Sequence, residues 1–447
     1  MMNIFQSMYS KLKRNDFAHS VAVLLSGTAV SQIVIVALTP LLTRLYPPET
    51  FGVLSVYLSL MLPIGVLTSL HYESAIPLPD EESDALNLLA LSLSVLFINV
   101  VLSIFILGFF GQSLMNLFNI KGIGPVILYL PLSIFGFGLF QVFQLWLLRK
   151  ENYPQIAKGK VRMNVTQFFS QIGLGVITGT SSGLVAGEVI GRIIGGGGMA
   201  HASWKNAKDA YKYISMQAMW KVAIRYRRFP LLASWSSVLN GLTQHLPALF
   251  IAYSLGAKAA GLYLIANRLL ALPDALLGYS VKQVYIAKSA KVIHHSLSEF
   301  TSLFWSTVKK MGLISAAVYI PATLLLPLLL PYVFGGNWGD AGIFVQCLSL
   351  LFFFQLVIGP ISANFYLLEQ QFIQVMCEGV RLILLLTGMV VSHLFYEKTW
   401  QVLLCLSIAG ALGTIILGFS AWYVLNRQQK KCKSAGGEPY RYTYRKQ

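Results

Sequence analysis

The sequence has little charge and few cysteines. Charged residues make up 11% of its 447 residues, whereas a soluble protein carries about 25%. Its four cysteines form no C-x-x-C pair, which argues against a disulfide framework and against a zinc site. No G-x-x-x-x-G-K-[ST] stretch occurs, so the chain shows no sign of an ATP site. These features argue against a soluble protein, a disulfide-stabilised domain and an ATPase.

The sequence is instead rich in long apolar runs. Hydrophobic residues make up 55% of the chain, and residues 21–42 and 53–70 are two uncharged runs. About 20 apolar residues are enough to cross a bilayer as a helix, and these runs lack the alternation of transmembrane barrel strands. Two prolines and a glycine lie in the connector between them, so a turn is expected there. The sequence predicts an all-α polytopic membrane protein that begins with a transmembrane hairpin.

The same reading along the whole chain predicts about twelve transmembrane helices in two six-helix bundles. The predicted spans are residues 21–42, 53–70, 85–110, 126–148, 163–178, 184–202, 229–255, 259–281, 311–334, 341–368, 372–395 and 400–425. The expected organisation is a cytoplasmic N-terminus (1–19), a first bundle (20–203), a cytoplasmic inter-bundle loop (204–228), a second bundle (229–426) and a basic cytoplasmic tail (427–447).

Basic residues are distributed very unevenly between the two predicted sides. Of the 34 Lys and Arg residues, 27 fall in the predicted inner segments and 4 in the outer loops. Basic residues favour the cytoplasmic side, so both termini are expected in the cytoplasm. The net charge of +17 then reflects topology and attraction to anionic membrane lipids, and no nucleic-acid partner is expected.

A weak internal repeat relates the two halves. Gly52 opens an apolar helix that reaches Pro63, and Gly261 opens another that reaches Pro273, each in the second predicted span of its half. A parallel repeat of two bundles is typical of transporters with a central cleft. Proline kinks a helix, so Pro63 and Pro273 are hinge candidates, with static kinks for packing as the alternative interpretation.

Ionisable residues inside the predicted spans are the candidate site residues, because charges within a bilayer are costly and often functional. Arg268 has no acid three or four residues away on its helix, so it is expected to face an anion, a wet cavity or an acid on another helix. No catalytic or metal-binding spacing is recognisable, and neither an enzyme nor a cofactor is expected. Candidate substrate-binding residues are Arg268, Arg192, Arg381 and Arg44, and candidate ion-coupling residues are Asp274, Glu188 and Glu378.

Three stretches resemble one transporter family. They are residues 41–52, residues 72–82 with Ala85 and Asn87, and residues 256–268. They are similar to motifs of polysaccharide-repeat flippases, which belong to the multidrug/oligosaccharidyl-lipid/polysaccharide (MOP) exporter superfamily. One large subgroup usually has an arginine before the Tyr-Glu pair, and this chain has His71 there.

The resemblance implies a MATE/MOP-like fold in the bacterial inner membrane. It also implies that the protein flips undecaprenyl-pyrophosphate-linked oligosaccharide units by alternating access for surface polysaccharide (O-antigen or exopolysaccharide) biosynthesis. A polysaccharide polymerase and glycosyltransferases are then candidate partners. The first alternative is a drug/cation antiporter of the same superfamily, which favours an acid-lined cavity. The second is a membrane glycosyltransferase or polysaccharide polymerase, which needs a large outer catalytic loop.

Overall fold

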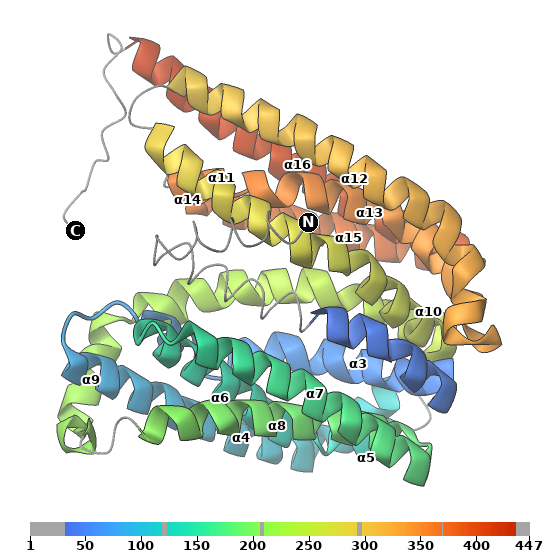
Figure 1. Cartoon of the computed structure of the whole chain (residues 1–447), viewed down its shortest axis with the longest axis horizontal. Helices are drawn as coiled ribbons and strands as arrows, with labels where there is room; N and C mark the ends of the chain where they lie inside the picture. Colours follow the sequence, from blue (N-terminus) through green and yellow to red (C-terminus); the bar gives the residue numbers. More distant parts are fainter. Residues whose placement is uncertain (1–31, 119–122, 206–209, 293–296, 369, 435–447) are drawn as a thin grey trace, which may run out of the picture. The chain divides into compact units, whose positions relative to one another are not determined.

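All regular elements in the described part of the chain are helices (Figure 1). The computed structural model describes residues 32–118, 123–205, 210–292, 297–368 and 370–434. The predicted N-terminal segment 1–19 and the first half of the first predicted span lie outside these ranges. Eight helices of the described part are long and apolar enough to cross a membrane. The expectation of an all-helical membrane protein is therefore confirmed.

The helix α4 (Glu82–Phe118) shows most clearly what surrounds the protein. Only 6% of the residues in its most apolar stretch are buried, and α12 (Leu297–Phe334) has 17% buried. Phe105 and Phe109 of α4 have 59% and 78% of their surface exposed. Helices this apolar and this little covered by protein require lipid around them. The chain is a multi-pass membrane protein.

The chain divides into two compact units, Met1–Gly261 and Leu262–Gln447. The first holds the helix Gln32–Leu45, α3 (Pro48–Gly65), α4, α5 (Ile123–Ile127), α6 (Leu130–Arg149), α7 (Tyr153–Thr178), α8 (Ser181–Lys205), α9 (Met216–Arg225), the π-helix η3 (Phe229–Ala233) and the short 3-10 helices η1 (Tyr72–Ala75) and η2 (Ala210–Tyr213). The second holds the π-helix η4 (Asp274–Gly278), α11 (Tyr279–Val292), α12, the 3-10 helix η5 (Gly336–Trp338), α13 (Ala341–Ile361), α14 (Asn364–Leu367), α15 (Gln371–Phe395) and α16 (Thr399–Ser434).

The helix α10 (Ser234–Pro273) runs from the first unit into the second and joins the seventh and eighth predicted spans. Its backbone leaves helical geometry at Gly256, where φ is 87°. That conformation is accessible to glycine and costly for other residues. The division between the units thus falls beyond the loop 204–228 that the sequence suggested, and the arrangement of twelve spans as six and six stays a prediction.

Glycines fix how α8 packs in the first unit. A Cβ atom added to Gly187 would lie 2.5 Å from Cγ of Gln171, and one added to Gly191 would lie 2.5 Å from Cβ of Gln167, both on α7. Across the other side of α8, a Cβ on Gly196 would lie 2.8 Å from the carbonyl oxygen of Gly136 on α6. Small residues let helices approach closely. Four glycines spaced four residues apart therefore give α8 its close contact with α7: Gly183, Gly187, Gly191 and Gly195.

Gly52 and Gly261, the two glycines of the internal repeat, lie where two helices touch, and each one packs against the backbone of the other's helix. A Cβ on Gly52 would collide with the carbonyl oxygen of Ala257, and one on Gly261 would collide with the carbonyl oxygen of Pro48. Each carbonyl belongs to the residue four positions before the other glycine. The repeat therefore has a physical reason: the start of α3 and the adjacent part of α10 pack backbone against backbone, and any side chain at either glycine would separate them.

Several segments expected to be loops are helical. The helix α7 begins at Tyr153, because the Asn152 side chain accepts a hydrogen bond from Gln155 N at 3.3 Å and Pro154 occupies the first turn; both features favour a helix start. Lys158, Lys160 and Arg162 therefore lie on a helix. The predicted inter-bundle loop 204–228 contains α9. The helix α11 continues from the end of the eighth predicted span to Val292, and α16 continues through the start of the tail to Ser434. Hydropathy alone missed these polar helical extensions.

Candidate functional site

A polar cluster inside the first unit centres on α8. Arg192 Nη2 donates to Oε1 of Glu188 at 2.6 Å, and Gln167 Nε2 on α7 donates to the other carboxylate oxygen. Glu188 and Arg192 are only 4% and 9% exposed. The Arg192 guanidinium also lies 5.3 Å from the ring centroid of Phe137 on α6. Glu188 and Arg192, four residues apart on α8, thus form an ion pair, and both of its charges are contacted by neighbouring helices.

Two further helices bring polar groups to this cluster. The hydroxyls of Tyr57 on α3 and Ser133 on α6 are 2.6 Å apart and buried. Arg192 and Glu188 lie within electrostatic range of the Tyr57 hydroxyl. Sequence reasoning missed Tyr57, Ser133 and Gln167, because an uncharged polar residue within a predicted span does not reveal which residue of another helix it will contact. Burying polar groups requires that they be paired, and the four helices together pair most of these groups, leaving Arg192 Nε without a partner among the described residues.

The second unit has a looser pair on α15. Arg381 Nη1 lies 3.6 Å from Oε2 of Glu378, three residues earlier. Neither Oε2 of Glu378 nor Nε of Arg381 has a hydrogen-bond partner among the described residues, and the side chains are 12% and 13% exposed. The Arg381 stem packs against α16, where a Cβ added to Gly413 would lie 2.7 Å from its Cγ. This arginine keeps donor capacity that a phosphate can use.

Asp274 occupies an irregular part of the second unit. It opens the π-helix η4 directly after Pro273, and π-helical turns are frequent at functional sites. Its Oδ1 lies 3.7 Å from the position of a Cβ on Gly359 of α13, and Lys282 is within electrostatic range. The carboxylate is therefore half-buried between two helices with a cation in range. Pro273 ends α10 at this point, so its hinge role stays a prediction.

The other predicted site residues are more scattered. Arg268 is half-buried on α10 and is not an isolated charge in the structure. Arg44 is exposed at the end of the helix Gln32–Leu45. Pro63 is buried two residues before α3 ends at Gly65, and its role as a hinge stays a prediction.

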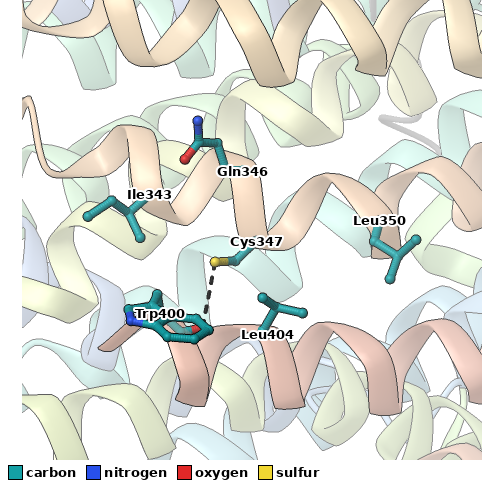
Figure 2. A pocket seen from close by; sticks show the side chains of 6 residues that line it. All are labelled: Ile343, Gln346, Cys347, Leu350, Trp400 and Leu404. Atoms are coloured by element: carbon teal, nitrogen blue, oxygen red, sulfur yellow. Dashed lines mark hydrogen bonds between the residues drawn. The ribbon is translucent and has the colours of Figure 1, made fainter. Parts of the chain in front are cut away.

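The described cavities do not coincide with these charges. A pocket of about 430 Å³ lies between α13 and α16 and is lined by Ile343, Gln346, Cys347, Leu350, Trp400 and Leu404 (Figure 2). Its polar groups are few, and the Cys347 thiol donates to the carbonyl oxygen of Trp400 at 3.6 Å. It is an apolar groove on membrane helices. No cluster of three or more potential metal ligands occurs in the part of the chain that the structure describes.

Comparison with protein families supplies the identity. The family model described as "Polysaccharide biosynthesis protein" matches residues 41–342, more than half of the chain. The chain belongs to the polysaccharide biosynthesis protein family. The match covers the three stretches on which the resemblance rested. No curated protein matches the sequence.

Solved structures show how this polysaccharide biosynthesis protein is folded. It is similar to a multidrug resistance MATE family transporter of the MOP superfamily in an inward-facing conformation, with a TM-score of 0.67, 15% identity, and 89% of this chain and 96% of that chain covered. It is equally similar to the lipid II flippase MurJ in an inward closed conformation, with a TM-score of 0.68, 15% identity, and 92% and 91% covered. A MOP superfamily transporter from Pyrococcus furiosus matches with a TM-score of 0.55, 13% identity, and 91% and 95% covered. The fold is that of the MATE and MurJ transporters.

Proposed function

We propose that the protein flips undecaprenyl-pyrophosphate-linked oligosaccharide repeat units across the bacterial inner membrane by alternating access. The observation that supports this most is the polysaccharide biosynthesis family match over residues 41–342. The similarity of the fold to that of a lipid II flippase supports a lipid-linked substrate. Moving such a substrate breaks no covalent bond, so the protein acts as a transporter and not as an enzyme.

Arginines on the membrane helices are the proposed contacts for the pyrophosphate. The guanidinium is weakly hydrated and binds phosphate oxygens bidentately. Arg268 lies in the membrane span Ser237–Ser289, and Arg381 keeps Nε without a hydrogen-bond partner among the described residues. Arg192 is committed to Glu188, so we assign it to holding the first unit together. Arg44 is exposed and is a contact for the sugar or phosphate outside the apolar core.

A drug/cation antiporter is the competing function, because the fold resembles MATE transporters as closely as it resembles MurJ. An antiporter of cations favours acids without neutralising partners in its cavity. In this chain Glu188 and Glu378 each have an arginine in range, and Asp274 has Lys282. The pairing of each membrane acid with a cation favours an anionic substrate.

The experiment that tests the proposal compares cells with and without the gene. We expect its deletion to remove surface polysaccharide and to leave repeat units attached to their lipid carrier inside the cell, with both restored by the intact gene. The same strains are grown with cationic drugs. Normal surface polysaccharide in the deletion strain together with increased drug sensitivity would favour the antiporter instead.

A further inference from the structure

The connection between α3 and α4 contains an unusual turn. Leu70 and His71 are successive non-glycine residues with positive φ angles, 50° and 58°. Such conformations are costly and persist only where the surroundings hold them, often at functional sites. They come directly before the Tyr-Glu pair, and none of the proposed pyrophosphate contacts lies in this connection. The turn therefore needs its own explanation.

Three neighbouring elements hold this connection in place. The Arg149 guanidinium at the end of α6 donates to the carbonyl oxygens of Ile76 and Pro79. Asn99 Nδ2 on α4 donates to the carbonyl oxygen of Thr68 at 2.9 Å, and the Tyr72 hydroxyl donates to that of Ala223 on α9 at 3.3 Å. Fixing the backbone from three sides stabilises the strained turn, and it also fixes what the turn buries.

The turn buries a small polar pocket. Glu73 is 3% exposed, and its Oε1 lies 3.6 Å from Nδ1 of His71. Its Oε2, the His71 Nε2 and the Ser69 hydroxyl are all buried without a regular hydrogen-bond partner among the described residues. Buried polar atoms are normally satisfied. Three unsatisfied atoms on three residues of one buried turn indicate a site that takes up an additional small species.

Among the described residues of the elements around this turn, the other charged groups are paired, bound to backbone or exposed. On α4, Glu82 is paired with Lys150 and Asp84 with Arg225, and η3 carries no charged residue. On α6, Arg149 is bound to backbone carbonyl groups of the connection. Lys221 on α9 is exposed. The imidazole of His71 is thus the cation partner available to Glu73, and the pair is neutral when it holds one proton.

We propose that Ser69, His71 and Glu73 form a proton-binding site that couples movement of the α3–α4 connection to the uptake and release of one proton. In the closed turn one proton, bound by either the carboxylate or the imidazole, keeps the buried pocket neutral. When the connection opens, water solvates the charged groups and the proton leaves to water. The coupling role rests on the proposed transport function, but the site itself does not.

The electrostatics of the pocket predict how the stability of the protein changes with pH. Burial raises the pKa of the Glu73 carboxyl above its usual value, and His71 and the Ser69 hydroxyl offset part of that rise. A carboxyl with a higher pKa in the folded than in the unfolded chain takes up a proton on folding. Its contribution to the free energy of unfolding is therefore fully present at pH values below the pKa of the unfolded chain. That contribution is lost as pH rises through the pKa of the folded chain.

The test measures the thermal unfolding midpoint of the purified full-length protein from about pH 5 to about pH 9. We expect the midpoint of the native protein to fall by several degrees as pH rises above the ordinary pKa of a glutamate. Glu73→Gln, a neutral isostere, is expected to lose this component of the fall. Glu81→Gln is the matched control, because Glu81 is an exposed acid of the same connection, and its profile should follow that of the native protein.

A second variant keeps the test decisive if Glu73→Gln does not fold. Asparagine tolerates a positive φ, so His71→Asn keeps the turn and removes the imidazole. Without that cation the carboxyl pKa rises further, and the fall is expected to extend to higher pH than in the native protein. Parallel profiles for the native protein and whichever variant folds would overturn the proposal. A second outcome would also overturn it. If sodium raises the unfolding midpoint of the native protein while choline does not, and sodium has no effect on Glu73→Gln, the pocket binds a metal cation instead of a proton.

The coupling role is tested separately in proteoliposomes with a fluorescent prenyl-pyrophosphate-linked oligosaccharide. An imposed pH gradient should accelerate flipping by the native protein and leave Glu73→Gln unaffected. If no protein flips the probe, the proposed function fails while the unfolding profiles still decide the proton site. If the native protein flips the probe equally with and without the gradient, the coupling role is wrong and the proposed function stands.

Discussion

Two glutamate–arginine pairs, on α8 and on α15, have the same residue types and different surroundings. Glu188 and Arg192 are spaced i,i+4, lie 2.6 Å apart and receive a further hydrogen bond from Gln167. Glu378 and Arg381 are spaced i,i+3, lie 3.6 Å apart and leave two buried polar atoms without hydrogen-bond partners among the described residues. Each arginine keeps a buried Nε without a partner among the described residues, but the Glu188 carboxylate accepts two hydrogen bonds whereas Glu378 Oε2 accepts none. The second pair is therefore held more loosely. Spacing along a helix predicts a pair, but only the neighbouring helices decide whether the pair is structural.

The largest expected effect concerns an arginine outside both pairs. Arg268 is half-buried in the membrane span Ser237–Ser289, where a guanidinium can bind phosphate oxygens bidentately. We expect Arg268→Ala to abolish polysaccharide export at near-normal protein level. Arg268→Lys should keep part of the activity, because the charge remains and the bidentate fork is lost. Surface polysaccharide and membrane protein abundance are measured together, and normal export by Arg268→Ala would exclude the proposed phosphate contact.

The comparison of the two pairs is tested by removing each arginine. Arg192→Ala leaves Glu188 buried without its cation, which costs about 3–5 kcal/mol, and we expect low protein abundance. Arg381→Ala removes a weaker interaction, at about 1–3 kcal/mol, and should lower abundance less. The double variant Glu188→Gln/Arg192→Met removes both charges and should recover part of the loss. If the two alanine variants destabilise the protein equally, the distinction between a closely hydrogen-bonded pair and a loose pair is wrong.

The packing around the two pairs predicts a smaller difference between two glycines. A Cβ on Gly191 of α8 would meet Gln167 and the carbonyl oxygen of Met163, whereas a Cβ on Gly379 of α15 would meet nothing within 4 Å. Gly191→Ala should cost about 1–3 kcal/mol through overpacking, and Gly379→Ala should gain about 0.5–1 kcal/mol from helix propensity. Thermal unfolding midpoints in detergent check both. A neutral Gly191→Ala would show that α7 and α8 are not tightly packed there.

The sequence predicted the helices well and the site only in part. Apolar runs identify membrane helices because each must satisfy its own backbone in lipid, so hydropathy located α3, α4, α13 and α16. It did not show that α7 begins before its apolar run, because a helix start depends on local caps such as Asn152. The Glu188–Arg192 pair was visible because both residues lie on one helix, whereas the contribution of Tyr57 depends on how α3 packs.

The same limit applies to the pocket beside α3. The sequence singled out the stretch containing Glu73 by resemblance, but not the burial of its carboxylate. That burial follows from the left-handed turn at His71 and from Arg149, which is distant in sequence. Tertiary contacts of this kind leave no periodic signal in the chain.

Flipping by the purified protein tests the central claim most directly. The full-length protein is reconstituted into vesicles with a fluorescent prenyl-pyrophosphate-linked oligosaccharide, and a membrane-impermeant quencher reports how much probe becomes accessible with time. We predict fast exchange with the native protein, little with Arg268→Ala, and none of comparable rate for a matched lipid whose head group carries no phosphate. Equal rates for vesicles with and without the protein, or equal flipping of both lipids, would contradict the assignment as a flippase for pyrophosphate-linked oligosaccharides.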